Sequence, residues 1–132
     1  MLVDFYRIIE KPLLSGELAS QDQTLKKRLY LVELNPSHPV YQGHFPGNPI
    51  VPGVCQVQII KELVALTLQK EIIMIKSDNI KFLSMIVPAQ TPILEVRLDI
   101  TEKEKDQWDV NAIISSDKQV FLKFRGGFKP DY

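Results

Sequence analysis

The sequence predicts an α+β fold in which an antiparallel sheet wraps around one central helix. Residues 54–70 contain neither glycine nor proline, and apolar residues recur there at helical spacing. Several short runs rich in Ile, Val, Leu and Phe follow this segment, with turn residues between them. Two further strand-like segments precede it, separated from it by a loop rich in helix and strand breakers.

The two expected N-terminal strands cover residues 5–14 and 26–34, with a polar connection over 15–24. The second strand alternates well, which suits a strand with both faces partly covered. Residues 35–52 then carry five prolines, together with Gly43 and Gly47. We expect no regular element at that density of breakers, and long loops of this kind tend to be functional.

The central helix is expected over residues 54–70, as four or five turns that are largely buried. Its apolar residues at helical spacing are Val54, Val57, Ile60, Val64 and Leu68. Strands are expected over residues 72–74, 79–87, 92–101, 108–115 and 119–129, with a turn at 116–118. The hot-dog fold, with about five to seven strands, is the compact solution for this order. The alternative, a helix flanked on one side only by a flat sheet, would leave the largely apolar helix partly exposed to water. We also expect dimerisation.

Composition restricts the class of protein. The 132 residues fit a single domain, expected to span 1–132, and 45% hydrophobic against 24% charged residues is an ordinary globular balance. Sixteen basic and sixteen acidic side chains cancel, so no global field attracts nucleic acid or a membrane surface. Cys55 is the single cysteine, which excludes an internal disulfide framework. With neither a leader-like N-terminus nor a long apolar run, we expect a cytoplasmic location.

His44 is the leading candidate for chemistry. It is one of two histidines and lies inside the breaker-rich loop, framed by Gly43, Pro46, Gly47, Pro49, Pro52 and Gly53. Prolines restrict φ and glycines allow close backbone approach, so this frame would fix the imidazole. Histidine titrates near neutrality and can act as a general base. The alternative is a histidine with only a surface or packing role.

The start of the helix is the second candidate. Gly53 and Val54 would present N–H groups that have no intrahelical partners, and the helix dipole adds positive potential there. Such donors could polarise a carbonyl group and stabilise an enolate. The alternative is that Pro52 and Gly53 only form a turn before the helix.

Residues 43–54, Gly-His-Phe-Pro-Gly-Asn-Pro-Ile-Val-Pro-Gly-Val, resemble the signature of the 3-hydroxyacyl-acyl-carrier-protein dehydratases of fatty acid synthesis. Residues 80–88, Ile-Lys-Phe-Leu-Ser-Met-Ile-Val-Pro, are similar to the basic-aromatic stretch that follows the central helix in that family. The resemblance implies a hot-dog dimer whose two sheets join, with active sites in tunnels at the interface. Trimers of dimers are common in the family.

The resemblance also implies roles for individual residues. His44 would abstract the proton beside the thioester carbonyl, the carbonyl of Ile50 would orient the imidazole, and the N–H of Gly53 would hold the thioester oxygen. The remaining motif residues expected to contact substrate are Phe45, Gly47, Pro52 and Val54. Neither a metal nor a redox cofactor is implied.

One position departs from the family pattern. The family's second catalytic group is a carboxylate on the partner's central helix, and that position holds Gln58 here. Glutamine has no acidic proton to give, although it can hydrogen-bond a hydroxyl or a water. Glu62 follows four residues later on the same helix face, where the family usually has glutamine. Glu62 is therefore the alternative acid, unless it is merely a solvated or hydrogen-bonded helix residue.

Other reactive or charged residues have simpler interpretations. Cys55 is expected to pack as a small apolar residue rather than act as a nucleophile. His38 either assists substrate entry or lies in a surface loop. Four basic residues could form a patch for an acidic carrier protein or a solvated strand face: Lys26, Lys27, Arg28 and Lys81.

Two classes of function follow. The first is an enzyme, a dehydratase or hydratase acting on 3-hydroxyacyl groups carried by acyl carrier protein or coenzyme A, in fatty acid or related polyene or polyketide synthesis. The second is a non-catalytic acyl-thioester-binding subunit that pairs with a competent dehydratase, or a hot-dog thioesterase. A thioesterase usually needs a carboxylate to direct water, so Gln58 counts against that reaction as well.

Overall fold

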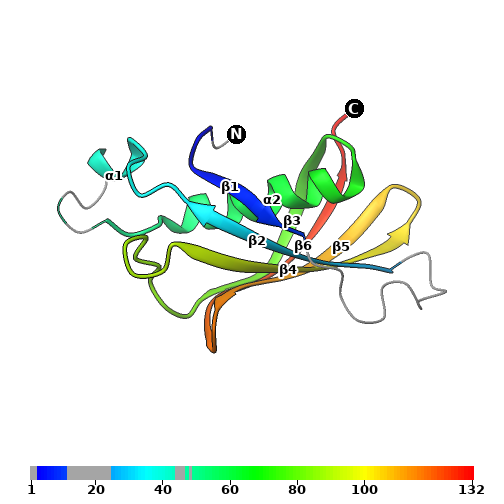
Figure 1. Cartoon of the computed structure of the whole chain (residues 1–132). Helices are drawn as coiled ribbons and strands as arrows, with labels where there is room; N and C mark the ends of the chain where they lie inside the picture. Colours follow the sequence, from blue (N-terminus) through cyan, green and yellow to red (C-terminus); the bar gives the residue numbers. More distant parts are fainter. Residues whose placement is uncertain (1–2, 12–24, 44–46, 48) are drawn as a thin grey trace.

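A single antiparallel sheet dominates the computed structural model, which describes residues 3–11, 25–43, 47 and 49–132 (Figure 1). The strands within these residues lie in the order β1-β2-β4-β5-β6-β3. Their bounds are Tyr6–Glu10 for β1, Leu25–Leu34 for β2, Ile72–Phe82 for β3, Ile93–Glu104 for β4, Gln107–Ser116 for β5 and Gln119–Pro130 for β6. Two helices, α1 (Val40–Gly43) and α2 (Gly53–Leu68), lie between β2 and β3 in the chain.

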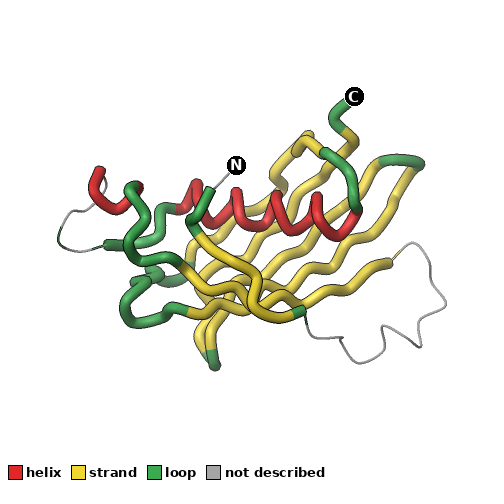
Figure 2. Tube along the Cα trace, turned by 45° about the horizontal axis from the view of Figure 1, so that its top comes forward, coloured by secondary structure: helices red, strands yellow, loops and turns green. Residues whose placement is uncertain are grey.

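The long helix α2 lies across one face of the sheet (Figure 2). This arrangement confirms the predicted α+β, hot-dog architecture. The core lies between the helix and the sheet, and the helix contributes to it Cys55, Gln56, Ile59, Ile60, Leu63, Val64 and Leu68. Val54 was expected on the inward face, but it is 76% exposed. Val54 lies in the first turn of the helix. It is not on the face that carries Ile59 and Leu63, which point toward the sheet.

The sequence pattern predicted the last three strands, β4, β5 and β6, well. In β4 the side chains that point to the core are all buried: Leu94, Val96, Leu98 and Ile100. The expected turn between the last two strands is present, and Asp117 adopts a left-handed φ of 52° in it.

Three expectations about the elements need correction. The segments expected as separate strands over 72–74 and 79–87 form one strand, β3, which continues through two bulges and ends at Phe82. The breaker-rich loop contains one helical turn, α1, because its prolines at 39 and 46 lie outside the four residues that form it. The first strand ends at Glu10, and residues 12–24 of the expected strand and connection lie outside the described residues.

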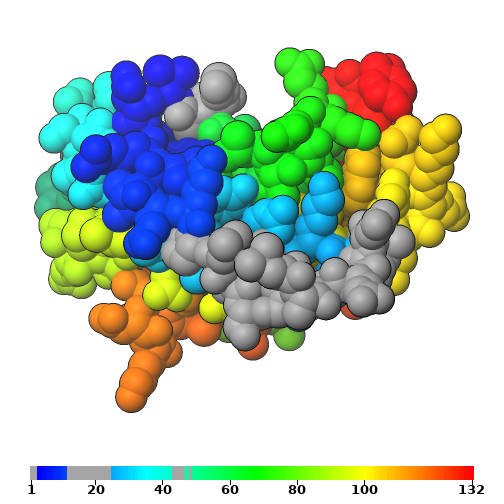
Figure 3. All heavy atoms as spheres, turned by 45° about the vertical axis from the view of Figure 1, so that its right-hand side comes forward, coloured from blue at the N-terminus to red at the C-terminus, as the bar shows by residue number. Residues whose placement is uncertain are grey.

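The N-terminal strand lies beside the helix as well as beside β2. The blue atoms of the N-terminal segment and green atoms of the α2 to β3 region emerge on one face of the molecule (Figure 3). Phe5, directly before β1, is fully buried. The adjacent Tyr6 is therefore held close to the exposed side of α2, where the candidate site lies.

Candidate active site

The breaker-rich loop leads into α2. His44 and Phe45 lie outside the described residues, so their predicted roles stay predictions. Gly47 adopts a φ of +84°, a conformation that side chains with a Cβ rarely adopt, so this position requires glycine. At the end of the loop, the Val51 N–H donates to the carbonyl oxygen of Ile86 at 2.9 Å. This bond joins the two segments that carry the family resemblance.

Helix α2 begins at Gly53, the position where the sequence placed the candidate backbone donors. The N-cap residue, Pro52, is extended, and its carbonyl oxygen accepts from the N–H groups of Cys55 and Gln56 at 3.0 and 3.1 Å. The N–H groups of Gly53 and Val54 precede these bonds, and helix geometry gives them no intrahelical partner. The ring of Phe82 packs on Gly53 so closely that a Cβ there would lie 2.7 Å from Cζ of the ring. The absence of a side chain at Gly53 therefore makes room for the Phe82 ring.

Gln58 and Glu62 interact directly. The Gln58 Nε2 donates to Oε2 of Glu62 at 3.0 Å, as expected for residues one helical turn apart. A carboxylate can only accept, so this contact assigns the nitrogen of the amide to the Glu62 side and turns the Gln58 carbonyl oxygen away from it. Both side chains are half-buried. The prediction that Glu62 lies on the face of Gln58 is confirmed.

A third residue completes this cluster. The hydroxyl of Tyr6, on β1, donates to Oε1 of Glu62 at 2.9 Å. Burial raises the pKa of Tyr6 well above its usual range, and the hydrogen bond and negative charge of Glu62 raise it further. The phenol therefore stays protonated and remains a donor at physiological pH. We refer to Tyr6, Gln58 and Glu62 as the helix cluster.

A family model described as the ApeI-like, or ApeI dehydratase, family matches residues 20–124. The chain belongs to the ApeI-like dehydratase family. Among curated relatives, the 3-hydroxyacyl-acyl-carrier-protein dehydratase FabZ of Rickettsia bellii is 25% identical over 92 residues, which cover 64% of this chain and 62% of the relative. The FabZ protein of Rickettsia massiliae matches with the same identity and coverage. The ApeI-like chain thus spans less than two thirds of the length of these relatives.

Solved structures with the same fold support the architecture. An uncharacterized protein from Erwinia carotovora subsp. atroseptica has a TM-score of 0.72 at 18% identity, covering 99% of this chain and 98% of the other. The dehydratase heterocomplex ApeI:P from Xenorhabdus doucetiae has a TM-score of 0.62 at 17% identity, with coverages of 93% and 96%. An (R)-hydratase from A. caviae involved in PHA biosynthesis has a TM-score of 0.60 at 12% identity, with coverages of 84% and 99%.

Two buried polar residues of the ApeI-like chain went unnoticed in the sequence. Gln56 is 3% exposed, and its Nε2 donates to the Val51 carbonyl oxygen at 3.2 Å, which ties the end of the loop to the helix. Neither its Oε1 nor the hydroxyl of Tyr41 has a hydrogen-bond partner in the described part of the chain. Tyr6 also went unnoticed, because a mixed polar and apolar strand does not reveal which residue reaches the helix.

The minor candidates have structural roles in the ApeI-like chain. Cys55 is buried, and burial raises the pKa of its thiol, which disfavours the nucleophilic thiolate. The His38 Nδ1 accepts from the Val40 N–H at 3.1 Å, and its Nε2 lies 2.9 Å from the Val3 carbonyl oxygen. Both ring nitrogens therefore have backbone partners, which hold the His38 ring in place within the loop. Three strands, β4, β5 and β6, lie between the basic residues of β2 and Lys81 on β3, so these residues do not form one continuous patch within a chain.

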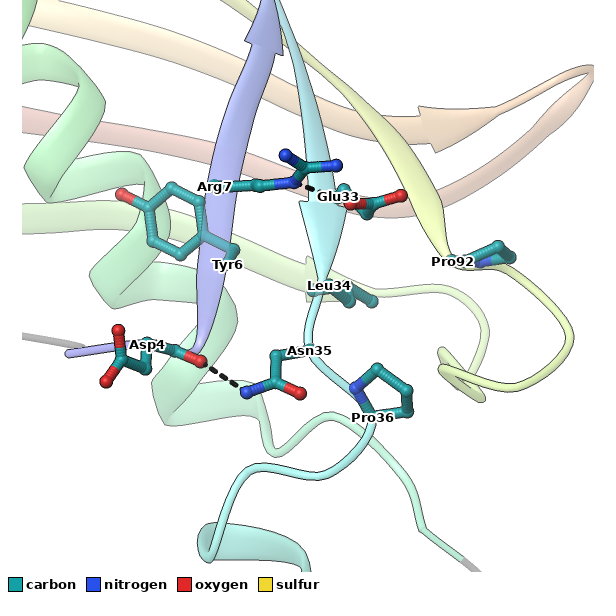
Figure 4. Close-up of a pocket in the computed structure, with 8 residues that line it drawn as sticks. All are labelled: Asp4, Tyr6, Arg7, Glu33, Leu34, Asn35, Pro36 and Pro92. Carbon is teal, nitrogen blue, oxygen red and sulfur yellow. Dashed lines mark hydrogen bonds and ion pairs between the residues drawn. The ribbon is translucent and has the colours of Figure 1, made fainter.

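A surface hollow of about 670 Å³ lies on the β1 side of the helix cluster (Figure 4). Its lining residues are Asp4, Tyr6, Arg7, Glu33, Leu34, Asn35, Pro36 and Pro92, and none of them was a predicted site residue. The described residues contain no group of three His, Cys, Asp or Glu side chains placed to hold a metal ion. No helix among them has the length and apolar character needed to cross a membrane.

Proposed function

We propose that this chain is a 3-hydroxyacyl-thioester dehydratase, which eliminates water from a 3-hydroxyacyl thioester or catalyses the reverse hydration. The observation that carries the proposal is the Glu62 carboxylate in direct hydrogen bond with Gln58, the residue at the family's carboxylate position. The substrate would be carried by acyl carrier protein or coenzyme A, in fatty acid or related polyene or polyketide synthesis. With one cysteine and no disulfide framework, we place the protein in the cytoplasm.

In the proposed reaction, His44 removes the proton from C2, and the N–H of Gly53 stabilises the negative charge that develops on the thioester oxygen. The C3–O bond then breaks, a C2–C3 double bond forms, and the departing hydroxyl takes a proton from Glu62, which enters the elimination as the carboxylic acid, and leaves as water. Gln58 would bind the 3-hydroxyl through its oriented amide, while Glu62, hydrogen-bonded to it, is the group that exchanges a proton. Ile50, Phe45, Gly47, Pro52 and Val54 would complete the substrate site.

A homodimer is part of the proposal, because each active site would combine His44 of one protomer with the helix cluster of the other. Two observations support it. In the described part of the chain β3 pairs only with β6, so its other edge is available to a second sheet. An apolar patch, which we call the helix-start patch, lies where β3 meets α2 and consists of Val54, Phe82, Leu83 and Met85, each more than half exposed. We further propose that residues 1–132 fold as one domain.

The reaction is testable in both directions with acyl-carrier-protein and coenzyme A substrates. Wild-type protein should interconvert 3-hydroxyacyl and enoyl thioesters, followed by the ultraviolet absorbance of the conjugated enoyl group and by a mass change of one water. His44→Ala should abolish the conversion. Glu62→Gln should lower kcat by roughly 10²- to 10⁴-fold, the range for loss of a positioned acid or base.

Other outcomes would point to other functions. Release of a free acid would indicate a thioesterase instead. If wild-type protein forms no product while Gln58→Glu does, the native chain is a binding subunit, and a partner with an intact histidine and carboxylate should co-purify with it. If Glu62→Gln keeps full activity, Glu62 has no part in the proton transfer.

A further inference from the structure

Two tyrosines reach from the sheet to α2 in the same way. Tyr6 of β1 donates to Oε1 of Glu62 at 2.9 Å, and the hydroxyl of Tyr30 on β2 lies 2.7 Å from Oγ1 of Thr67. The Thr67 hydroxyl in turn bonds the Leu63 carbonyl oxygen of its own helix at 2.8 Å. The Tyr30 contact therefore ends in the helix backbone. The Tyr6 contact ends on a carboxylate that also accepts from Gln58.

We propose that Tyr6 is a positioning residue, which fixes the Glu62 carboxylate and, through it, the Gln58 amide for the reaction on the 3-hydroxyl. This inference rests on the proposed dehydratase function. Each oxygen of Glu62 has its own donor, Tyr6 on Oε1 and Gln58 on Oε2, so the two contacts together restrict rotation of the carboxylate. Without Tyr6, Oε1 of Glu62 would lose the donor that joins this carboxylate to the sheet.

The strand that carries Tyr6 is anchored by the buried Phe5 before it and by its pairing with β2. Before it, Phe5 is fully buried, and its carbonyl oxygen accepts from the Asn35 N–H at 2.8 Å. After it, the Nε of Arg7 forms an ion pair with Glu33 at 2.6 Å. Tyr6 and Arg7 project to opposite sides of β1, so that the Tyr6 ring extends toward the helix (Figure 4). These anchors place the phenol on a fixed strand.

The donor also keeps its proton. Burial, followed by the hydrogen bond and charge of Glu62, raises the pKa of Tyr6 well above its usual range. A hydroxyl that stays protonated can donate to Oε1 of Glu62 both before and after that carboxyl group gives up its proton, and it does not itself exchange one. A phenylalanine would fill the same space but would leave Oε1 of Glu62 without this donor.

The test compares Tyr6→Phe with Tyr30→Phe, which removes the equivalent strand-to-helix hydroxyl but does not contact Glu62. Tyr6→Phe should lower kcat roughly tenfold to a hundredfold, as expected when a reacting group is misplaced, with a much smaller change in KM. Tyr30→Phe should leave kcat within about twofold, since it changes helix anchoring alone. Equal effects of the two substitutions on kcat would overturn the positioning role.

A double-mutant cycle separates action through Glu62 from a general structural effect. If Tyr6 acts through Glu62, then adding Tyr6→Phe to Glu62→Gln should cause almost no further loss of kcat. Multiplicative losses would contradict the inference while leaving the dehydratase function intact.

A readout without turnover distinguishes failure of the inference from failure of the proposed function. In protein labelled with carbon-13 at glutamate carboxyl groups, the Glu62 resonance should move in Tyr6→Phe and stay in place in Tyr30→Phe. If wild-type protein proves inactive on both thioesters, the dehydratase function fails, and an unmoved Glu62 resonance would then also refute the positioning of this carboxylate by Tyr6.

Discussion

At Gln58 and Glu62 this chain has the amide and the carboxylate in the reverse of the order found in the dehydratases that its sequence resembles. The pair keeps one carboxylate and one amide in mutual hydrogen bond, but the carboxylate sits about 6 Å further along the helix, at roughly 1.5 Å per residue. Exchanging the two residue types keeps the hydrogen bond between them. It places the amide, rather than the carboxylate, where it would meet the 3-hydroxyl first. We therefore expect the amide to bind the hydroxyl and the carboxylate to exchange the proton.

Tyr41 offers a prediction at the same scale. Its hydroxyl is buried without a partner in the described residues, whereas the equally buried Tyr30 hydroxyl bonds Thr67. Tyr41→Phe should therefore leave the free energy of unfolding unchanged or raise it by up to about 1 kcal/mol, while Tyr30→Phe should lower it by about 1 kcal/mol. Urea unfolding at pH 7 measures both. A loss from Tyr41→Phe as large as that from Tyr30→Phe would mean that the Tyr41 hydroxyl is satisfied.

Tyr41→Phe should also change how the free energy of unfolding depends on pH at alkaline pH. Burial raises the pKa of Tyr41 to about 12, with a smaller contribution from the nearby Cys55, whereas a tyrosine in the unfolded chain ionises near about pH 10. Since the folded-state pKa is the higher one, stability is complete below about pH 10 and falls as the pH rises toward 12. Tyr41→Phe removes this titration, so its unfolding free energy should fall less steeply over that interval.

Local pattern predicted some of these residues and missed others for a physical reason. The shared helix face of Gln58 and Glu62 follows from their four-residue spacing alone. The Tyr6 contact joins residues 56 positions apart and exists only because β1 pairs with β2 and so comes to lie beside α2. No local period encodes such a contact. The same holds for Gln56, a polar residue within an apolar helical run, whose burial depends on the position of Val51.

At the scale of elements, β3 shows where a sequence pattern fails. Polar residues at 76–79 interrupt its apolar runs, which is why two strands were expected there. The structure keeps one strand by inserting bulges between Met74 and Lys76 and between Ser77 and Asn79. Opposite these bulges lie Gly126 and Gly127 of β6. The strand continues because the partner backbone can approach closely at that point.

This account predicts unequal effects for two neighbouring glycines. A Cβ at Gly126 would lie 2.8 Å from the backbone oxygen of Lys76, whereas a Cβ at Gly127 would meet side-chain atoms, of which the nearest is Cε of the movable Lys76 at 3.2 Å. Gly126→Ala should therefore lower the free energy of unfolding by about 2 kcal/mol, and Gly127→Ala by less than about 1 kcal/mol. Thermal and urea unfolding would measure the difference. Equal losses would show that the bulge does not depend on close approach at Gly126.

At the scale of the whole molecule, the order of elements was enough to predict the fold, because one helix and a long antiparallel sheet have few compact arrangements. The order of elements could not show which apolar surfaces remain exposed to solvent in a single chain. The helix-start patch is such a surface: Phe82 packs on Gly53, while Leu83 and Met85 are 51% and 69% exposed. Together with the open edge of β3, it is the surface that we assign to the proposed dimer, in which a second copy would complete the active site.

Lysine substitutions on this surface should separate the protomers. The double variant Leu83→Lys/Met85→Lys places two charges in the helix-start patch, and desolvating them at an interface is costly. A matched control, Ile9→Lys/Ile93→Lys, changes two apolar residues of similar type that are 39% and 41% exposed on β1 and β4, away from β3. Light scattering coupled to size-exclusion chromatography should give a dimer for wild type and control and a monomer for the patch variant. Because each proposed site draws on both protomers, the monomer should also lose dehydratase activity while keeping its circular dichroism spectrum. A patch variant that stays dimeric and fully active would place the protomer interface elsewhere on the molecule.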